Sequence, residues 1–584
     1  MLKQLNYVFS RREKVLLFCL MVIVVIGSFL ELIGVALFSP FIEIIMKPQV
    51  VTENELLNSL YEFSNASSTK SFLTLLAVAI MCVYVVKNIF LWGEQNYILK
   101  FSYNNQRNLS TRLLKTYLTQ PYTFHLNKNI AELQRSMQED TALFTQLLIH
   151  FLQLIAEITV CCVMGIYLFL VSKSIATVTS VLLIVCVGFF TYVTKQFSKS
   201  LGKEAQVYKG KIYQWINQSL GGVKEVKVLN REKFFIDSYN KYFKLYIRDV
   251  RLNKLLSMTP KYLVETVCMS GLLLAIIIKM NFGKGDLVDF LPQLAVFAVA
   301  AFRLLPSVGR INEHVNNILY ASPSVELIYH DLKEIEEYEK EVIAKEEKHP
   351  WNFEKEISVQ DVVFSYPKSE VRVLENASLV IPKGKTVALI GSSGAGKTTL
   401  ADVILGLLSP TLGNVYVDEM DVYRNLSEWH KHIGYIPQSI YLSDDTIRNN
   451  IAFGIAEENI DDAAVQEALI KAQLSTFVND LPEGVNSFVG DRGVRLSGGQ
   501  RQRIGIARAL YHNPEILVFD EATSALDNDT EKAVMESIES LHGTKTMILI
   551  AHRLTTIKKA DIIYEIIDGK AVEKTKKDIF GEEL

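Results

Sequence analysis

The chain has 584 residues, which is long enough for several domains, and 49% of them are hydrophobic. Its formal net charge of -3 at pH 7 gives no reason to expect a nucleic-acid partner. The six cysteines all lie in apolar segments of the N-terminal half without metal-ligand spacing, so we expect them to act as small hydrophobic side chains.

Six apolar runs in the N-terminal half reach or approach the roughly 20 residues that cross the hydrocarbon core of a membrane. The first run follows a basic cluster and is too long for the core of a signal peptide. We therefore predict about six spanning helices in a transmembrane domain of residues 1–324. The runs are Val15–Met46, Phe72–Trp92, Leu143–Leu170, Ile175–Thr194, Tyr262–Met280 and Leu287–Leu305.

Lysine and arginine are concentrated before the first run, between the second and third runs, and between the fourth and fifth. The alternate connections carry few basic residues. By the positive-inside rule, both termini are predicted to face the cytoplasm.

The two long basic connections keep apolar residues at helical spacing, for example over Leu109–Leu118 and Tyr208–Trp215. We expect the spanning helices to continue into the cytoplasm and to turn back near Pro121–Glu132 and Leu220–Leu229. These tips would touch the soluble domain. The alternative is a disordered basic loop, against which the apolar periodicity argues.

Two other segments of the N-terminal half have distinctive patterns. Val51–Phe63 places leucines and a tyrosine among polar residues, which suits either a short amphipathic helix on the outer surface or a plain polar loop. Residues 325–352 are rich in charge and are predicted to be a solvated linker or an exposed helix end. A second domain, residues 353–584, follows.

The second domain contains Gly-Ser-Ser-Gly-Ala-Gly-Lys-Thr between the β-prone run Thr386–Ile390 and the helical pattern Leu400–Leu405. This is G-x-x-x-x-G-K-[ST] in the strand–loop–helix context it requires, although a glycine-rich turn alone is possible. Lys397 is expected to reach the β- and γ-phosphates of ATP, and Thr398 to hold Mg²⁺. The candidate ATP-binding residues here are Gly391, Ser392, Ser393, Gly394, Ala395, Gly396, Lys397, Thr398 and Thr399.

Strand and helix patterns alternate along the second domain, which is typical of an α/β core. One buried strand, Ile516–Phe519, leads into two adjacent carboxylates at its C-terminal end, where open α/β sheets bind ligands. Asp520 fits a Mg²⁺ ligand, and Glu521 fits a base that polarises the attacking water, unless the pair is merely a solvated strand end.

Between the phosphate loop and this strand, Leu496 precedes a Ser-Gly-Gly-Gln sequence that opens a helix. Its unpaired N–H groups form a second phosphate-binding surface, which we expect to serve a partner subunit. Its residues are Ser497, Gly498, Gly499 and Gln500.

The LSGGQ sequence, lying between the phosphate loop and the ILVFDE strand, resembles the nucleotide-binding domain of ABC transporters. With six spanning helices before it, the chain is similar to a bacterial exporter-type half-transporter. The resemblance implies a membrane α-helical domain with long cytoplasmic extensions fused to an α/β P-loop domain. It also implies ATP hydrolysis with Mg²⁺, a homodimer, and a multi-pass protein of the bacterial cytoplasmic membrane.

The resemblance further implies individual roles. Tyr366 matches the aromatic residue that stacks on adenine, Gln438 the residue that meets Mg²⁺ and faces the membrane domain, and His552 the histidine that contacts the γ-phosphate. Gln438 and His552, together with Lys397 and Glu521, form a complete catalytic set. Two equivalent sites are therefore expected, each between the phosphate loop of one subunit and the LSGGQ loop of the other.

Four basic residues lie in or near the spanning runs, where each charge costs roughly 2.5–3.5 kcal/mol. They would line a cavity that suits an anionic headgroup such as a diphosphate. As an alternative, Lys87 and Arg310 could snorkel or pair with Glu94, Glu265 or Glu31. The candidate substrate residues are Lys87, Lys261, Arg303 and Arg310.

Ala301–Ile311 and Pro260–Glu265 look like the corresponding segments of lipid-linked oligosaccharide flippases of the PglK type. This resemblance implies ATP-driven flipping of a polyprenyl-diphosphate-linked oligosaccharide, with membrane lipid and this lipid-linked glycan as partners. A multidrug or lipid A-type exporter would favour a more aromatic, less basic cavity. A peptide exporter of the same architecture is another alternative.

Overall fold

The computed structural model describes residues 2–36, 41, 44–45, 51, 55–64, 68–171, 173–282, 291–343, 352–367, 369–520, 535–536, 538–551 and 557–581. Contacts within the chain divide it into two compact units. The first unit comprises Met1–Gln120 and Lys128–Tyr338, and the second comprises Pro121–Asn127 and Glu339–Leu584.

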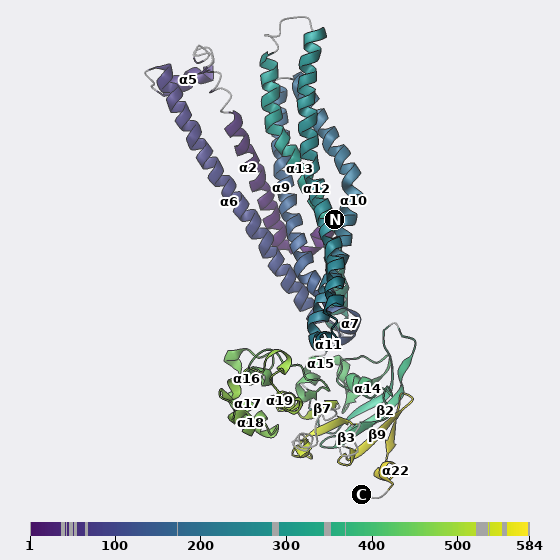
Figure 1. Cartoon of the computed structure of the whole chain (residues 1–584). Coiled ribbons are helices and arrows are strands. Elements are labelled where there is room, and N and C mark those ends of the chain that lie inside the picture. The colour runs from purple at the N-terminus through teal and green to yellow at the C-terminus, as the bar shows by residue number, and fades with distance from the viewer. Residues whose placement is uncertain are drawn as a thin grey trace. The chain divides into compact units, whose positions relative to one another are not determined.

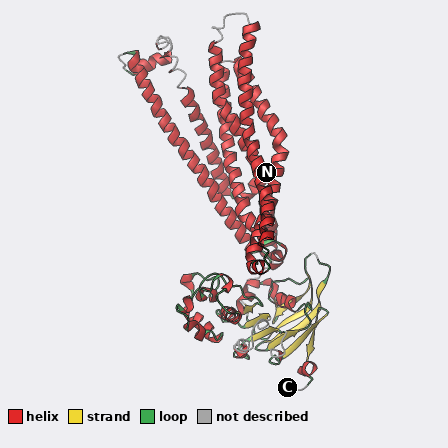
Figure 2. Cartoon of the chain, viewed as in Figure 1, coloured by secondary structure: helices red, strands yellow, loops and turns green. Residues whose placement is uncertain are grey.

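Within the described residues, the first unit contains six long helices, which confirms the predicted number (Figures 1 and 2). Four of them have 50, 49, 51 and 53 residues. At 1.5 Å per residue each is about 75 Å long, more than twice the thickness of the hydrocarbon core, so they extend well out of the membrane. The six are α2 (Arg11–Ala36), α6 (Thr69–Leu118), α9 (Thr141–Val171), α10 (Lys173–Gly221), α12 (Glu232–Phe282) and α13 (Leu291–Ile343).

Some helices of the first unit are long and apolar enough to cross a membrane. Among the described residues, three helical segments are long and apolar enough to span: Arg11–Glu31, Lys70–Leu118 and Ile130–Val163. These belong to the first, second and third of the predicted spans.

Short helices occupy the positions at which the chain was predicted to turn. α7 (Tyr122–Asn127) and α11 (Val223–Val228) lie at the two predicted tips, and Pro121–Asn127 belongs to the second unit. The remaining short helices of the first unit are α1 (Leu2–Val8), α5 (Glu55–Phe63), α8 (Ile130–Arg135) and the π-helix η1 (Ser136–Asp140).

Within the predicted segment Val51–Phe63, residues 55–63 form the amphipathic helix α5. Its Tyr61 ring meets Phe72 edge-on at 5.2 Å between centroids, and Leu57 packs against the same small core. Phe63, in contrast, is 89% exposed. One face of α5 is therefore buried against α6, while an aromatic ring stays uncovered at its end.

Buried polar contacts join the helices of the first unit near η1. The carboxylate of Asp140 accepts hydrogen bonds from Ser324 Oγ (2.7 Å) and Gln206 Nε2 (2.8 Å), and it lies 3.3 Å from Arg135 Nε. Asp140 is only 1% exposed, so its charge depends on these partners. The network links η1 to α10 and α13.

The helix α13 continues through the segment predicted as a linker. Val325, Ile328 and Leu332 are buried, and the first unit ends at Tyr338. The first unit therefore extends beyond residue 324, because the apolar side of the helix persists beneath its charged surface.

The second unit contains a sheet of four strands in the order β2-β1-β4-β5 and a sheet of six in the order β10-β9-β3-β8-β7-β6. In the larger sheet, β9, β3, β8, β7 and β6 are parallel, and β10 is antiparallel to β9. The strands are β1 (Glu356–Ser365), β2 (Arg372–Pro382), β3 (Thr386–Ile390), β4 (Leu412–Val417), β5 (Met420–Asp421), β6 (Ile433–Ile436), β7 (Ile516–Asp520), β8 (Thr546–Ile550), β9 (Ile562–Ile567) and β10 (Lys570–Lys574).

Helices cover this core, and its predicted strands at Thr386–Ile390 and Ile516–Phe519 are confirmed. The fully buried Trp429 donates its indole N–H to the carbonyl of Ile404 at 2.9 Å, which fixes α15 to α14. The helices are α14 (Lys397–Ile404), α15 (Leu426–Trp429), α16 (Ile447–Ile451), α17 (Asp462–Lys471), α18 (Ser475–Asn479), α19 (Gly498–Leu510) and α22 (Lys576–Phe580).

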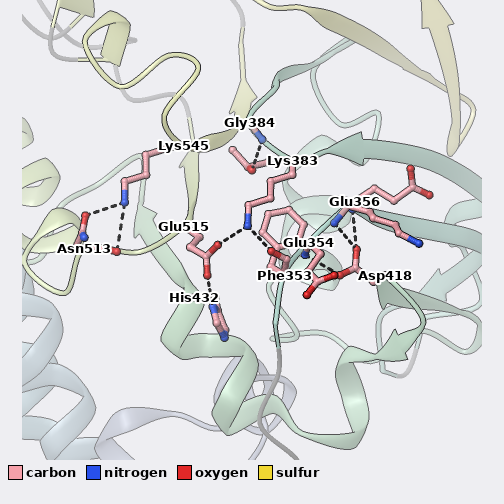
Figure 3. A network of polar contacts seen from close by, with 12 residues as sticks. Phe353, Glu354, Glu356, Lys383, Gly384, Asp418, His432, Asn513, Glu515 and Lys545 are labelled. Atoms are coloured by element: carbon pink, nitrogen blue, oxygen red, sulfur yellow. Dashed lines mark hydrogen bonds and ion pairs between the residues drawn. The ribbon is translucent and has the colours of Figure 1, made fainter.

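A polar network connects the segments that precede several strands (Figure 3). Glu515, directly before β7, accepts from Lys383 Nζ at 2.9 Å and lies 3.1 Å from His432 Nδ1, directly before β6. Asp418 accepts three backbone N–H groups, from residues 354, 355 and 356, at 2.8, 2.8 and 2.9 Å. Burial acts to raise the pKa of Asp418, but these donors outweigh it and hold the pKa below its usual range.

The substitution Asp418→Asn should destabilise the second unit by about 1–2 kcal/mol, because a neutral amide offers one oxygen where the carboxylate offers two. Thermal unfolding of the full-length protein measures the loss. The parent's advantage is complete above the unfolded-state pKa of about 3.9 and disappears as the pH falls through the lower folded-state pKa. The stability gap should therefore be constant from about pH 6 to 8.

A matched control is Asp568→Asn, which removes the same charge from another turn between two strands. Both residues have positive φ, 54° for Asp418 and 49° for Asp568. Within the part of the chain that the structure describes, the Asp568 side chain makes no hydrogen bond. Equal losses in the two variants would contradict the role assigned to Asp418.

Candidate nucleotide-binding site

The loop from Gly391 to Gly396 joins β3 to α14 and has a backbone that requires glycine at its ends. Gly391 and Gly396 have φ of +141° and +102°. A Cβ atom on Gly391 would lie 2.7 Å from the carbonyl oxygen of Ile566, and one on Gly396 would lie 3.0 Å from that of Val373. Side chains are therefore excluded at both positions by sterics as well as by backbone conformation.

Lys397 begins α14 and directs its ammonium group back into this loop. Its Nζ donates to the carbonyl oxygens of Gly391 (3.0 Å) and Ser392 (2.9 Å), and the residue is only 5% exposed. Ser392, Ser393, Gly394 and Thr398 are exposed, Ala395 is half-buried, and Thr399 is buried. A buried cation beside an exposed loop at a helix N-terminus suits a polyphosphate.

The parallel sheet brings other predicted residues to the same edge. Asp520 ends β7, pairs in register with Ile550 at the end of β8, and is 7% exposed. Gln438 follows the end of β6, beside β7, and is exposed. Because the carboxyl ends of parallel strands meet at one edge, both residues belong to the edge from which the Gly391 loop departs.

Asp402 on α14 is a residue that the sequence interpretation missed. Burial, and to a smaller extent the nearby Asp520 carboxylate, together raise the pKa of Asp402 to about 6. The two carboxyl groups therefore lie close together. Asp402 follows Thr398 by four residues, so helical spacing places both on one face and could have revealed it.

The donor set at this edge fits Mg²⁺. The Thr398 hydroxyl, the Asp520 carboxylate and the Gln438 amide oxygen are hard oxygen donors, which this ion prefers. No cluster of three or more His, Cys, Asp or Glu side chains occurs in the part of the chain that the structure describes. A single carboxylate is sufficient because Mg²⁺ in such sites is also held by substrate phosphates and water.

Tyr366 lies beside the phosphate loop, directly after β1. Its hydroxyl is 3.0 Å from Thr399 Oγ1, and its ring meets Phe364 edge-on at 5.1 Å between centroids. The side chain is half-buried. An aromatic face is thus held next to the loop, as adenine stacking requires.

The helix α19 begins with a capping box. Ser497 Oγ accepts from the N–H of Gln500 at 3.2 Å, and Gln500 Oε1 accepts from the N–H of Ser497 at 2.8 Å. Gly498 is exposed and Gly499 is buried. The box uses two donors at this helix end, and the glycine N–H groups remain the candidates for binding an anion.

Glu521 and His552 lie outside the described residues, so their placement stays a prediction.

The predicted substrate residues of the first unit lie in different surroundings. Lys87 is 9% exposed and its Nζ is 4.6 Å from the centroid of the Tyr84 ring. Lys261 is exposed and its stem lies against Gly309, the residue before Arg310. The backbone of Arg303 is helical, and its side chain is outside the described part.

Arg310 has an acidic partner that the sequence interpretation did not consider. Its Nε donates to Glu157 Oε1 at 2.5 Å and its Nη2 to Glu157 Oε2 at 3.1 Å. The candidates weighed from sequence were Glu94, Glu265 and Glu31. The structure instead places the carboxylate of Glu94 against Gly27, on the neighbouring helix α2.

The fold and the site together define a class of membrane protein in which long hydrophobic helices are joined to a P-loop nucleotide-binding domain. Family profiles match residues 17–299 as an ABC transporter transmembrane region and residues 374–524 as an ABC transporter. The chain belongs to the ABC transporter family.

Similar proteins include ATP-dependent lipid A-core flippases. That of Wigglesworthia glossinidia brevipalpis is 32% identical over 405 residues, covering 68% of this chain and 67% of the relative. That of Francisella tularensis subsp. tularensis (strain SCHU S4 / Schu 4) is 33% identical over 398 residues, covering 66% of this chain and 63% of the relative. The match thus spans a little under two thirds of the Francisella protein's length.

The solved structure of a bacterial Atm1-family ABC exporter with ATP bound has the same fold. Its TM-score is 0.73 at 21% sequence identity, over 98% of this chain and 96% of that chain.

The substitution Tyr366→Ala should weaken ATP binding by about tenfold, because stacking of a base on an aromatic ring contributes roughly 1–3 kcal/mol. Tyr366→Phe is the matched control, since it keeps the ring and removes only the hydroxyl that meets Thr399. Binding of a fluorescent ATP analogue to the full-length protein measures both. If Phe loses as much affinity as Ala, the hydroxyl and not the ring face is what matters.

Proposed function

We propose that this protein is an ATP-driven exporter in which two copies of the chain form two composite ATP sites. Each site pairs the Lys397 loop of one copy with the Ser497 helix end of the other. The capped start of α19 and its exposed Gly498 support this arrangement, since a nucleotide held by Lys397 does not need a second phosphate-binding loop from its own chain. Thr398, Gln438 and Asp520 would hold Mg²⁺, which would neutralise charge on the phosphates.

The residues of this chain then act in sequence. Lys397 binds the phosphates and Tyr366 orients the adenine. Glu521 polarises the attacking water and His552 contacts the γ-phosphate. Once the γ-phosphate leaves, the contact that joins the two copies is lost, and the short helices α7 and α11 pass the separation to the long helices.

The transported molecule is proposed to be a polyprenyl-diphosphate-linked oligosaccharide, moved across the bacterial cytoplasmic membrane. The observation that carries this is the basic character of the membrane helices, with Lys261 and Arg310 on neighbouring helices around Gly309. A diphosphate supplies the matching charge. The basic connections support the orientation with both termini in the cytoplasm.

A lipid A-type substrate is the second candidate, because similar proteins are named lipid A-core flippases. Lipid A-type and polyprenyl-diphosphate lipids both combine a glycan with acidic groups and hydrocarbon chains. The names of these similar proteins therefore support transport of a glycolipid. The experiment below distinguishes lipid A from a polyprenyl diphosphate as the lipid that carries the glycan.

The substitution Glu521→Gln should reduce ATP hydrolysis by about 10²–10⁴-fold while leaving ATP binding intact, because the amide cannot act as a general base. The variant should accumulate as a closed pair in ATP, detected by disulfide cross-linking between introduced cysteines at Ser497 and Ser393 of two copies. Lys397→Ala is the control that should prevent both binding and cross-linking. Full hydrolysis by isolated single copies would contradict the composite site.

Purified protein in lipid nanodiscs tests the substrate. Polyprenyl diphosphates carrying a glycan should stimulate ATP hydrolysis, and the double variant Arg303→Ala/Arg310→Ala should abolish this stimulation while basal hydrolysis persists. Neutral polyprenol is the control lipid. Stimulation by lipid A alone, or unchanged flipping in the double variant, would overturn the proposed substrate.

A further inference from the structure

A salt bridge between Glu157 of α9 and Arg310 of α13 joins these two helices, and its two side chains differ in their exposure to solvent. Glu157 holds the Nε and Nη2 edge of Arg310, and Arg310 Nη2 also lies 3.1 Å from Ser307 Oγ. The Arg310 side chain is 46% exposed, whereas that of Glu157 is 16% exposed. The carboxylate therefore holds the guanidinium from the buried side while part of the guanidinium remains accessible.

Other polar groups lie near this pair on α9, α12 and α13. His150 of α9 and His314 of α13 face each other with their Nδ1 atoms 3.0 Å apart. His314 lies four residues after Arg310 on α13. Lys254 of α12 pairs with Glu313 at 3.0 Å. Among these side chains Arg310 is the arginine, and its side chain is accessible.

We infer that Glu157 is the counter-ion that an anionic headgroup must displace from Arg310, so that Glu157 sets the selectivity of the substrate site. This inference rests on the proposed function, because it assumes that Arg310 meets the transported lipid.

The inference rests on the hydrogen-bonding chemistry of the Arg310 guanidinium. A guanidinium binds a carboxylate and a phosphate through the same pair of parallel N–H donors. With Glu157 in place the pair has no net charge, so a neutral or cationic molecule gains nothing from replacing the carboxylate. A diphosphate carries more charge than one carboxylate and can take the same donors. The salt bridge therefore discriminates against ligands without an acidic headgroup.

Removing the competing charge should strengthen binding of the lipid. In Glu157→Gln, the concentration of polyprenyl diphosphate that gives half-maximal ATPase stimulation should fall by about tenfold. In Arg310→Ala it should rise by about tenfold. Glu313→Gln is the matched control, since it removes a carboxylate from a neighbouring ion pair without contacting Arg310, and it should leave the concentration unchanged.

The two variants are expected to change the half-maximal concentration in opposite directions, which distinguishes a selectivity role of Glu157 from a purely structural one. If the pair only holds α9 to α13, Glu157→Gln and Arg310→Ala break it equally and both raise the half-maximal concentration, which overturns the inference while the proposed substrate stands. Failure of the parent protein to respond to polyprenyl diphosphate overturns the proposed function first. Should Glu157→Gln not fold, Glu157→Asp keeps the charge at a shorter reach and should lower the concentration by a smaller factor.

A native thiol gives an independent measurement. Cys161 lies one helical turn after Glu157 and is half-buried, whereas the neighbouring Cys162 is exposed. In single-cysteine versions of the protein, polyprenyl diphosphate should slow maleimide labelling of Cys161 at least about threefold and leave Cys162 unchanged, since adjacent residues point about 100° apart on a helix. Equal protection of both, or of neither, would contradict binding at this pair.

Discussion

The parallel register of β3, β8, β7 and β6 is the constraint on which the nucleotide site depends. It sends the carboxyl ends of four strands to one edge, where the Gly391 loop, Asp520 and the segment leading to Gln438 begin. A shift of one residue in any strand would turn its side chains to the opposite face and withdraw its loop. The polar contacts of Glu515 and Lys383 hold the opposite ends of the strands, so the register is stabilised away from the chemistry (Figure 3).

The first unit has no sheet among its described residues. Polar contacts between its helices instead fix the positions of the helices relative to one another. Asp140 joins three elements through short hydrogen bonds, and Arg112 links α6 to Glu336 of α13 at 2.5 Å. Inside such a bundle each charge needs a partner, because an unpaired one costs several kcal/mol. The pairing of Arg310 follows from this requirement, and it means that a basic residue in a spanning segment is not automatically available to a ligand.

The sequence was a good guide to features that are local in the chain. The phosphate loop, the cap at Ser497 and the six long helices all follow from short patterns of residues, and the structure has each of them. Contacts between distant helices were beyond such patterns. Choosing Glu157 over Glu94 as the partner of Arg310 requires the rotation and axial offset of α9 against α13, which depend on packing along the whole bundle. The continuation of α13 past residue 324 agrees with the predicted alternative of a helix end, but the charge on its surface concealed the buried apolar side formed by Val325, Ile328 and Leu332.

The location of the Arg310 salt bridge bears on release as well as on entry. An exporter that binds an anion tightly must also let it go, and a guanidinium left without a partner in a low-dielectric site would oppose release. Glu157 lies within hydrogen-bonding reach of Arg310, so under the proposed function it would retake the Arg310 donors when the headgroup leaves. The carboxylate that is proposed to weaken binding would therefore also lower the free-energy cost of emptying the site. Because ATP hydrolysis supplies only a finite driving force for each cycle, a self-compensating pair suits turnover better than an uncompensated cation of higher affinity.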